Sequence, residues 1–356
     1  MKILSLEAFP VDLKLQVALN VAYGSYPELN YVLIKIQTDN GLLGIGEASP
    51  DPVVTGETQM SVLESLGEAA NFLPGLSAFD IGSIIELCME RIPTFPSAIA
   101  AIDMALYDLV GKALQAPAYQ LLGGRNRSGM RLYPVIPMDE PAIMAGMSKK
   151  FVEMGARALK VKLGSDPEVD IERLYRITEM VGRNVRLRPD INQGWRDAGV
   201  AIQTIRRMQE LNIEYIEQPV AANDLDGLAQ VTAAVDIPIM ADESCHDPSD
   251  LFKIASMQAA DMINIKLMKC GGIYQAQKML AIAEAARLPC ILGSMGESTI
   301  GSAAGLHFVT ANAGIRACEL LGPLFILNDP AEGFLIDPTT FEASASFKPG
   351  LGVQLK

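Results

Sequence analysis

Acidic side chains recur at the ends of short apolar segments in the second half of the sequence. Asp190, Glu217 and Asp242 each end a short segment that is predicted to form a strand. Because the carboxyl ends of barrel strands meet at one face, we expect these three carboxylates to lie close together. Like charges at such short range need a cation between them, and all-oxygen ligands favour a hard ion, Mg²⁺ first and Mn²⁺ second. The sequence therefore predicts a divalent-metal site.

Lysines flank this acidic series on both sides. Lys160 and Lys162 lie two residues apart in one apolar segment, so the pleat of a strand turns both to the same face. Lys266 ends a later segment and would lie roughly across a barrel from them. Burial and the like charge of Lys160 disfavour an ammonium at Lys162, which suits it to act as a base. Beside a metal that stabilises the enolate, such a base can remove a proton α to a substrate carboxylate.

The elements that must hold these residues repeat along residues 131–320. Each unit is a short apolar strand, a polar residue near its carboxyl end, and an amphipathic helix, with about 24 to 28 residues between successive strands, which is the period of a strand plus a crossover helix. Eight such units predict an α/β fold that closes as a (β/α) barrel. The predicted strands are 132–136, 158–163, 185–189, 214–217, 237–241, 262–267, 290–293 and 316–320.

The first hundred residues show a different pattern. Strands are predicted over 31–38 and 42–48 around an Asp-Asn-Gly turn, followed by helices over about 58–72 and 97–114. A glycine-rich break over 121–129 indicates a domain boundary. We therefore predict an N-terminal α+β capping domain over 1–125, which the strand-like C-terminal segment 330–356 joins, and a catalytic barrel over 126–329.

Composition and charge exclude several classes of partner. The chain carries 42 acidic against 29 basic residues, a net charge of -13, and has no basic run, which argues against nucleic acid and anionic membrane surfaces. There is no signal-peptide core and no apolar run of membrane-spanning length. The five cysteines form no C-x-x-C pair and are expected to be reduced. We expect a cytoplasmic enzyme that acts on a small molecule.

Taken together, the motifs resemble the muconate-lactonizing subgroup of the enolase superfamily over the whole chain, capping domain included. They are Lys160-Val161-Lys162, Asp190-Ile191-Asn192-Gln193-Gly194-Trp195, Ile216-Glu217-Gln218-Pro219, Ala241-Asp242-Glu243-Ser244, and Ile265-Lys266-Leu267 with Gly271-Gly272. Neither histidine, His246 or His307, falls where the mandelate-racemase subgroup keeps its base. The resemblance implies a (β/α)7β modification of the barrel and a homo-oligomer.

The resemblance also implies a role for each site residue. Asp190, Glu217 and Asp242 would bind Mg²⁺, with a Lys base of the kind general to this superfamily. Lys162 and Lys266 would be the acid/base pair, and Lys160 would tune Lys162. Asn192 and Glu243 would contact the metal ligands and not the metal itself.

By the resemblance, the substrate is recognised at the seventh and eighth strands and by capping loops around 15–27 and 53–57, which would decide the reaction. Ser294, Glu297 and Glu319 are the predicted substrate contacts. Dipeptide epimerases carry Asp-x-Asp on the eighth strand, whereas this chain has Glu319-Leu320-Leu321, which resembles muconate cycloisomerases. A muconate-type cycloisomerase is therefore the first prediction, and an epimerase or racemase of dipeptides or N-acylamino acids, using two bases, is the second.

Three alternatives to these reactions stay open. The capping segment has no cation to meet a second substrate carboxylate, with Lys14 the nearest, so a neutral or amide-bearing substrate stays possible. A desolvated lysine at a barrel strand end also suits a Schiff-base aldolase, although the three carboxylates would then have no task. A binding protein without catalysis is the third alternative, which unchanged turnover in lysine variants would support.

Overall fold

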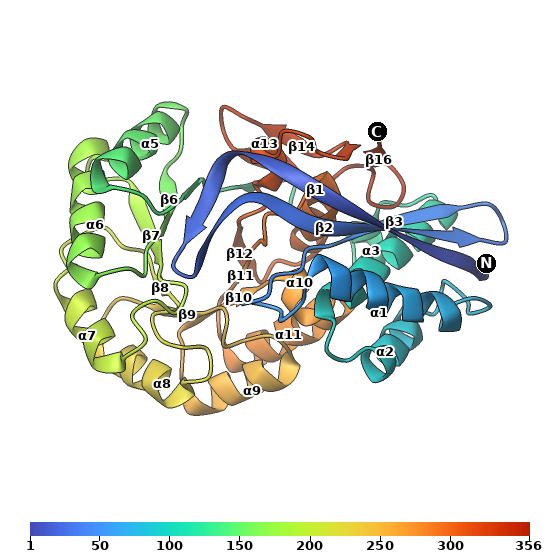
Figure 1. Ribbon diagram of the computed structural model, residues 1–356, viewed down its shortest axis with the longest axis horizontal. Coiled ribbons are helices and arrows are strands. Elements are labelled where there is room, and N and C mark those ends of the chain that lie inside the picture. Colours follow the sequence, from blue (N-terminus) through green and yellow to red (C-terminus); the bar gives the residue numbers. More distant parts are fainter.

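The structure, a computed structural model that describes residues 1–356, is built around a parallel eight-stranded sheet (Figure 1). The strand order is β12-β11-β10-β9-β8-β7-β6-β5. An isolated parallel bridge between Leu132 and Cys318 links the two ends of this series, so the sheet closes. The predicted α/β barrel with an N-terminal α+β unit is confirmed, and the strands follow one another around it in chain order.

All eight predicted barrel strands are present, although the paired ladders are shorter than the apolar runs. The largest difference is at the first strand, where only two residues pair with β6 and Leu132 makes its isolated bridge to Cys318 instead. The strands are β5 (Val135–Ile136), β6 (Ala158–Lys162), β7 (Arg186–Asp190), β8 (Ile216–Glu217), β9 (Ile239–Ala241), β10 (Met262–Ile265), β11 (Cys290–Leu292) and β12 (Ile315–Cys318).

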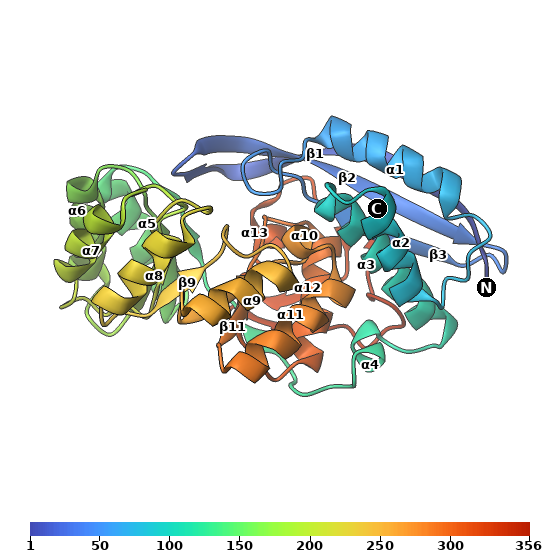
Figure 2. The ribbon, with the colours of Figure 1, turned by 90° about the horizontal axis from the view of Figure 1, so that it is seen from below.

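Helices cover the outside of the barrel (Figures 1 and 2). Several begin with a proline in the first turn or an aspartate cap, as in α6, where Asp166 accepts a hydrogen bond from the Glu168 amide at 2.8 Å. None of the helices combines the length and apolar character needed to cross a bilayer. The helices are α5 (Pro141–Glu153), α6 (Pro167–Val181), α7 (Ala198–Arg206), α8 (Leu225–Ala234), α9 (Pro248–Met257), α10 (Leu267–Cys270), α11 (Ile273–Ala286), α12 (Thr299–Ala311) and α13 (Gly322–Phe325).

The N-terminal unit packs helices on an antiparallel sheet of order β1-β2-β3. The predicted turn at 39–41 joins β2 to β3, and both predicted helices are present. Three elements were not predicted, namely the long strand β1 and the helices α2 and α4. The unit consists of β1 (Ile3–Val21), β2 (Gly24–Thr38), β3 (Leu43–Ala48), α1 (Gln59–Phe72), α2 (Ile81–Arg91), α3 (Pro96–Ala113) and α4 (Ala118–Leu121).

The end of the β1–β2 hairpin reaches over the barrel, as Figure 2 shows along its upper edge. The prediction of a capping loop at 15–27 is wrong, because most of these residues belong to the paired strands β1 and β2. Residues 13–21 place large apolar side chains at every second position, interrupted only by Ala18 between them, which is the pattern of a strand with one buried face. Backbone hydrogen bonds fix the hairpin to the barrel on both sides, from Leu327 to Lys14 O at 2.8 Å and from Met138 to Asn20 O at 2.9 Å.

Buried carboxylates of the N-terminal unit join it to barrel helices. Glu47 on β3 accepts hydrogen bonds from the Ser298 amide at 2.8 Å and the Gly301 amide at 3.0 Å, at the start of α12. Asp103 on α3 accepts a hydrogen bond from the Ile273 amide at 2.6 Å, at the start of α11. Because the amides at a helix N-terminus lack partners within the helix, these acids stabilise the joint.

The C-terminal segment contacts both units. Its strand β15 pairs with β14 and with β4 at the start of the barrel, whereas Gly350 O accepts a hydrogen bond from the Ala118 amide of α4 at 2.8 Å. The proposed domain bounds therefore stay a prediction. The strands here are β4 (Met130–Arg131), β13 (Ala331–Glu332), β14 (Leu335–Asp337), β15 (Glu342–Ser344) and β16 (Gln354–Leu355).

Candidate active site

Three buried carboxylates meet at the carboxyl ends of neighbouring barrel strands. Asp190 ends β7, Glu217 ends β8, and Asp242 directly follows β9. Each is 0 % exposed, and one oxygen of each lies within 4.8 Å of the others. Glu217 Oε2 is buried and has no hydrogen-bond partner. A buried orphan oxygen in an all-oxygen cluster fits a hard divalent cation, so these residues could hold one.

Lys160 and Lys162 lie on the same face of β6, as the spacing predicts, and contact the same oxygen. Their Nζ atoms are 3.0 Å and 2.7 Å from Asp190 Oδ2. Lys160 is further surrounded by Glu217 Oε1 at 2.9 Å and Glu319 Oε2 at 2.7 Å. Lys160 is therefore held by three carboxylates, whereas Lys162 contacts one.

Lys266 approaches the cluster from the other flank. Its Nζ lies 2.7 Å from Asp242 Oδ2. In the sheet order, the strands β7, β8 and β9 separate β10, which Lys266 follows, from β6, which carries Lys162. The structure thus brings two amines to opposite sides of one acidic centre, as expected from the sequence.

Asn192 and Glu243 form a bridge behind the cluster. Asn192 Oδ1 accepts a hydrogen bond from Lys162 at 3.0 Å, and its Nδ2 donates to Glu243 Oε1 at 2.9 Å. Asn192 adopts a φ of 43°, a left-handed conformation that asparagine tolerates better than most residues. Both residues lie where the sequence predicted, next to the carboxylates.

Two residues that support the cluster were missed from the sequence. Lys269 Nζ lies 2.5 Å from Asp242 Oδ1, and Asn264 Nδ2 donates to Glu217 Oε1 at 2.9 Å. Lys269 sits three residues after Lys266 in a segment that is otherwise apolar. A second lysine one helical turn after a strand-end lysine, with no polar neighbours, was the available signal.

Burial and neighbouring acids raise the pKa of some of these carboxyl groups, whereas neighbouring lysines lower the pKa of others. Burial, then the charge of Asp190, raises the pKa of Glu217 well above its usual value. Burial, then Asp242 and Asp190, raises the pKa of Glu243 to about 7. For Asp242, burial is outweighed by Lys266 and Lys269, which hold its pKa well below the usual value. Glu217 is therefore the acid of the cluster whose charge the lysines compensate least, and an added cation would stabilise its ionised form.

A cavity of about 560 Å³ borders the cluster. Its only basic lining residues are the three lysines at the cluster, and no arginine or histidine lines it. Exposed Glu28 and buried Asp51 add negative charge elsewhere on the wall. The other walls are largely apolar, and examples from the β1–β2 hairpin, α5 and α13 are Val17, Leu19, Met147, Phe151 and Phe325.

The three predicted substrate contacts differ in position. Ser294 and Glu319 line the cavity, although Glu319 Oε2 is occupied by Lys160. Glu297 is not among the lining residues, because it turns into its own loop and accepts hydrogen bonds from the Ser294 hydroxyl and the Met295 amide. Lys14, the nearest cation expected for a second substrate carboxylate, does not line the cavity either.

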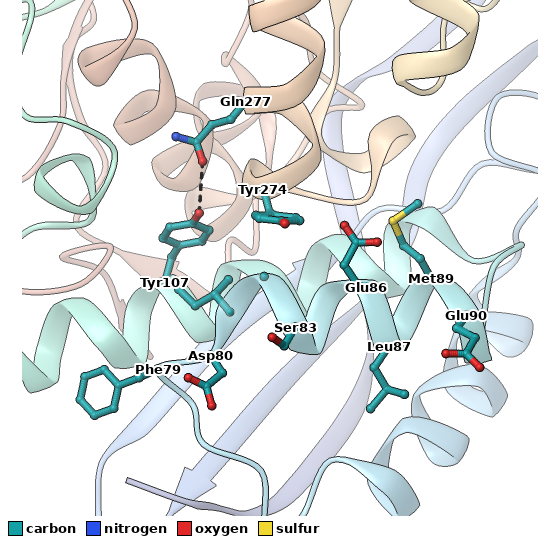
Figure 3. A pocket seen from close by; sticks show the side chains of 12 residues that line it. Phe79, Asp80, Ser83, Glu86, Leu87, Met89, Glu90, Tyr107, Tyr274 and Gln277 are labelled. Carbon is teal, nitrogen blue, oxygen red and sulfur yellow. Dashed lines mark hydrogen bonds between the residues drawn. The ribbon is translucent and has the colours of Figure 1, made fainter.

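A more open depression lies on the outside, between α2, α3 and α11 (Figure 3). There Tyr107 donates a hydrogen bond to Gln277 Oε1 at 3.4 Å, and the acidic side chains of Glu86 and Glu90 lie at the surface. None of the three clustered carboxylates and none of the lysines that contact them lines it. The chemistry is therefore concentrated at the barrel.

The chain is similar to known isomerases along its whole length. It is 36% identical to an N-succinyl-L-Arg/Lys racemase from Bacillus cereus, covering 100% of this chain and 96% of that protein. It is 31% identical to a chloromuconate cycloisomerase from Pseudomonas putida, covering 100% and 97%. A crystal structure of a dipeptide epimerase from Enterococcus faecalis, complexed with Mg and the dipeptide L-Leu-L-Tyr, superposes with a TM-score of 0.96 at 36% identity, covering 99% of this chain and 100% of that one.

Two family models together match nearly the entire chain. The mandelate racemase / muconate lactonizing enzyme N-terminal domain matches residues 4–123. The enolase C-terminal domain-like model matches residues 144–356, which contain the carboxylates and the lysines. The chain therefore belongs to the mandelate racemase / muconate lactonizing enzyme family of the enolase superfamily, whose members here are isomerases that depend on a divalent metal.

Proposed function

We propose that this isomerase is a Mg²⁺-dependent epimerase or racemase that inverts the carbon α to the carboxylate of an amide-bearing substrate. The observation that carries the proposal is the placement of Lys162 and Lys266 on opposite flanks of the carboxylate cluster, each open to the same cavity. Inversion needs one group to remove a proton from one face of a carbon and a second group to deliver a proton to the other face.

In this proposal Asp190, Glu217 and Asp242 hold the cation. When bound, Mg²⁺ would stabilise the negative charge that develops on the substrate carboxylate as the α-proton leaves. Mn²⁺ suits the same oxygen ligands.

The lysines do the proton transfer. Lys162 and Lys266 exchange roles, one as base and one as acid, according to which stereoisomer is bound. Lys160 stays charged, because the pull of burial on its pKa is outweighed by three carboxylates, of which Asp190 contributes most. Lys160 therefore orients Asp190 and Glu319 and stays out of the proton transfer.

The walls of the cavity support the substrate class. A neutral acyl or peptide group meets apolar surface on the hairpin and on α5, whereas a second carboxylate would meet no cation beyond the cluster. The name of the similar racemase refers to N-succinyl amino acids, and the similar epimerase is complexed with a dipeptide. Both kinds of compound have an α-carbon that carries a carboxylate and an amide nitrogen. An amide-bearing substrate with apolar side chains, such as a dipeptide, agrees with both observations, whereas a succinyl carboxylate would meet no cation beyond the cluster.

The second candidate is the muconate-type cycloisomerase expected first from the sequence. The contact of Glu319 Oε2 with Lys160 favours it, because it leaves only Oε1 of that acid to hold a substrate ammonium. The Schiff-base aldolase is not retained, because the similar proteins named above are isomerases and the carboxylate cluster would have no task.

Proton exchange separates these candidates. The protein is incubated in D₂O with MgCl₂ and, in separate reactions, N-acetyl and N-succinyl amino acids, apolar dipeptides and cis,cis-muconate, and the α-proton is followed by NMR. We expect deuterium at the α-carbon of at least one amide-bearing compound, with inversion. Conversion of muconate to a lactone, with no exchange in any amide-bearing compound, would reject the epimerase in favour of the cycloisomerase.

A further inference from the structure

Lys269 is the most completely enclosed amine beside the cluster. It lies in α10, and its side chain is 1 % exposed. Its Nζ contacts Oδ1 and the carbonyl oxygen of Asp242, each at 2.5 Å, and the carbonyl oxygen of Asn264 at 3.2 Å. An ammonium group has three protons, and each of these has an acceptor here. Lys269 therefore has no proton left to donate to a substrate.

Lys266 and Lys269 divide the two oxygens of one carboxylate between them. Lys266 contacts Asp242 Oδ2 at 2.7 Å and lines the cavity, whereas Lys269 contacts Oδ1 and is not among the lining residues. Lys269 also holds the backbone on which Asp242 sits, because it bonds to the carbonyl of that residue. The orientation of the carboxylate is thus fixed from the side away from the cavity.

We propose that Lys269 is a positioning residue of the metal centre, which holds Asp242 so that, at this carboxylate, an arriving divalent cation displaces only Lys266. Without Lys269, the carboxylate would be free to turn towards Lys266, its one remaining cation, and the metal would have to break a stronger contact. Two carbonyl oxygens would also each lose one donor, although Asp242 O would keep the Cys245 amide at 3.0 Å. The inference rests on the metal site of the proposed function, and on neither the substrate nor the direction of proton transfer.

Cation binding tests this role without any substrate. The dissociation constants of MgCl₂ and MnCl₂ are measured by titration calorimetry on the full chain for the wild type, K269M, K269R and K253M. We expect the constant of K269M to rise at least about tenfold, which corresponds to about 1.4 kcal/mol. K269R, which keeps the charge and the donors, should recover most of that loss. K253M is the matched control, because Lys253 lies on α9 and contacts only the exposed side of Asp250.

Two results would overturn the inference. Loss of a positive charge also weakens repulsion of the metal, so equal or tighter binding by K269M would mean that Lys269 merely opposes the cation. A lower melting temperature with an unchanged dissociation constant would mean a purely structural role. If K269M does not fold, K269Q is decisive in its place, with binding at least about threefold weaker expected and unchanged binding contradictory. Absence of cation binding by the wild type would instead reject the proposed metal site itself.

Discussion

The Nζ atom of Lys162 lies 2.7 Å from Oδ2 of Asp190, and Lys266 makes the same kind of contact with Asp242 on the other flank. Each proposed acid/base group is thus paired with a different proposed metal ligand. Binding of a cation at these carboxylates competes with both lysine contacts and directs the amines towards the cavity. Through this pairing, metal binding frees the Nζ atoms of both lysines for proton transfer.

Removing either lysine should abolish turnover. We expect Lys162→Ala and Lys266→Ala each to lower kcat by at least about 10³-fold, because a proton-transfer group is lost. Each variant should still exchange the α-proton of one stereoisomer with D₂O, the one whose proton faces the lysine that remains. Circular dichroism checks the fold, and K253A serves as the control. Loss of exchange for both stereoisomers in both variants would contradict a two-base reaction.

Removing divalent cations should remove activity reversibly. EDTA should abolish turnover, and MgCl₂ should restore it. Mg²⁺ at 100 times its dissociation constant should also stabilise the folded chain by about 2.7 kcal/mol, because it binds the folded state. Thermal unfolding with and without MgCl₂ measures this, and Asp190→Asn should show a much smaller shift. Equal shifts in the variant and the wild type would place the cation elsewhere.

His307 should make the protein sensitive to acid. Its Nδ1 accepts a hydrogen bond from the Tyr119 amide and its Nε2 contacts Leu351 O, so the buried ring must be neutral. Burial lowers the pKa of His307 to about 4 from 6.5. Between these values the unfolded chain binds a proton that the folded chain does not, so stability present above pH 6.5 is lost as the pH falls to 4.

The size of this effect is about 3 kcal/mol from the shift in pKa. Urea unfolding of the wild type from pH 7 to pH 4 should show this loss of unfolding free energy in addition to that from other groups. In His307→Gln the unfolding free energy should fall less steeply over the same range, by a slope that corresponds to about one bound proton fewer. Identical slopes for the two proteins would show that His307 does not titrate in this way.

Two glycine substitutions should shift stability in opposite directions. A Cβ at Gly46 on β3 would lie 2.0 Å from the carbonyl oxygen of Ala101 in α3, so Gly46→Ala should cost at least about 2 kcal/mol. A Cβ at Gly67, on the exposed side of α1, would meet nothing within 4 Å, so Gly67→Ala should stabilise the helix by about 0.5–1 kcal/mol. Denaturant unfolding of both variants measures the difference, and destabilisation by Gly67→Ala would contradict the packing described.

The sequence predicted best the parts in which one residue type has one physical explanation. A carboxylate such as Asp190 at the end of a buried strand has few other uses, and eight repeats of a strand followed by a helix define the barrel. The hairpin was harder, because the pairing of β1 with β2 shifts register between Lys14 and Leu19, and the end of the hairpin, within 15–27, was interpreted as a loop. Lys269 lies beyond its strand, where spacing along the chain does not report what a side chain reaches.

The reaction was predicted least well, because its determinants come from distant segments. Glu297 was expected at the substrate, yet a local hydrogen bond to the Met295 amide turns it away. Lys14 was considered as a cation for the substrate, but the pleat directs the odd-numbered residues of β1, such as Leu15 and Val17, to the cavity and leaves Lys14 outside. A strand assignment at 13–21 would have excluded it.

The hairpin that reaches over the barrel belongs to one unit, and the carboxylates and lysines belong to the other. Four residues of β1, namely Leu15, Val17, Leu19 and Val21, line the cavity at alternate positions of a single strand. Mutations at these positions can reshape what the enzyme accepts and leave the proton-transfer apparatus intact. Substrate selectivity can therefore change, in evolution or by protein engineering, separately from the residues that carry out the chemistry.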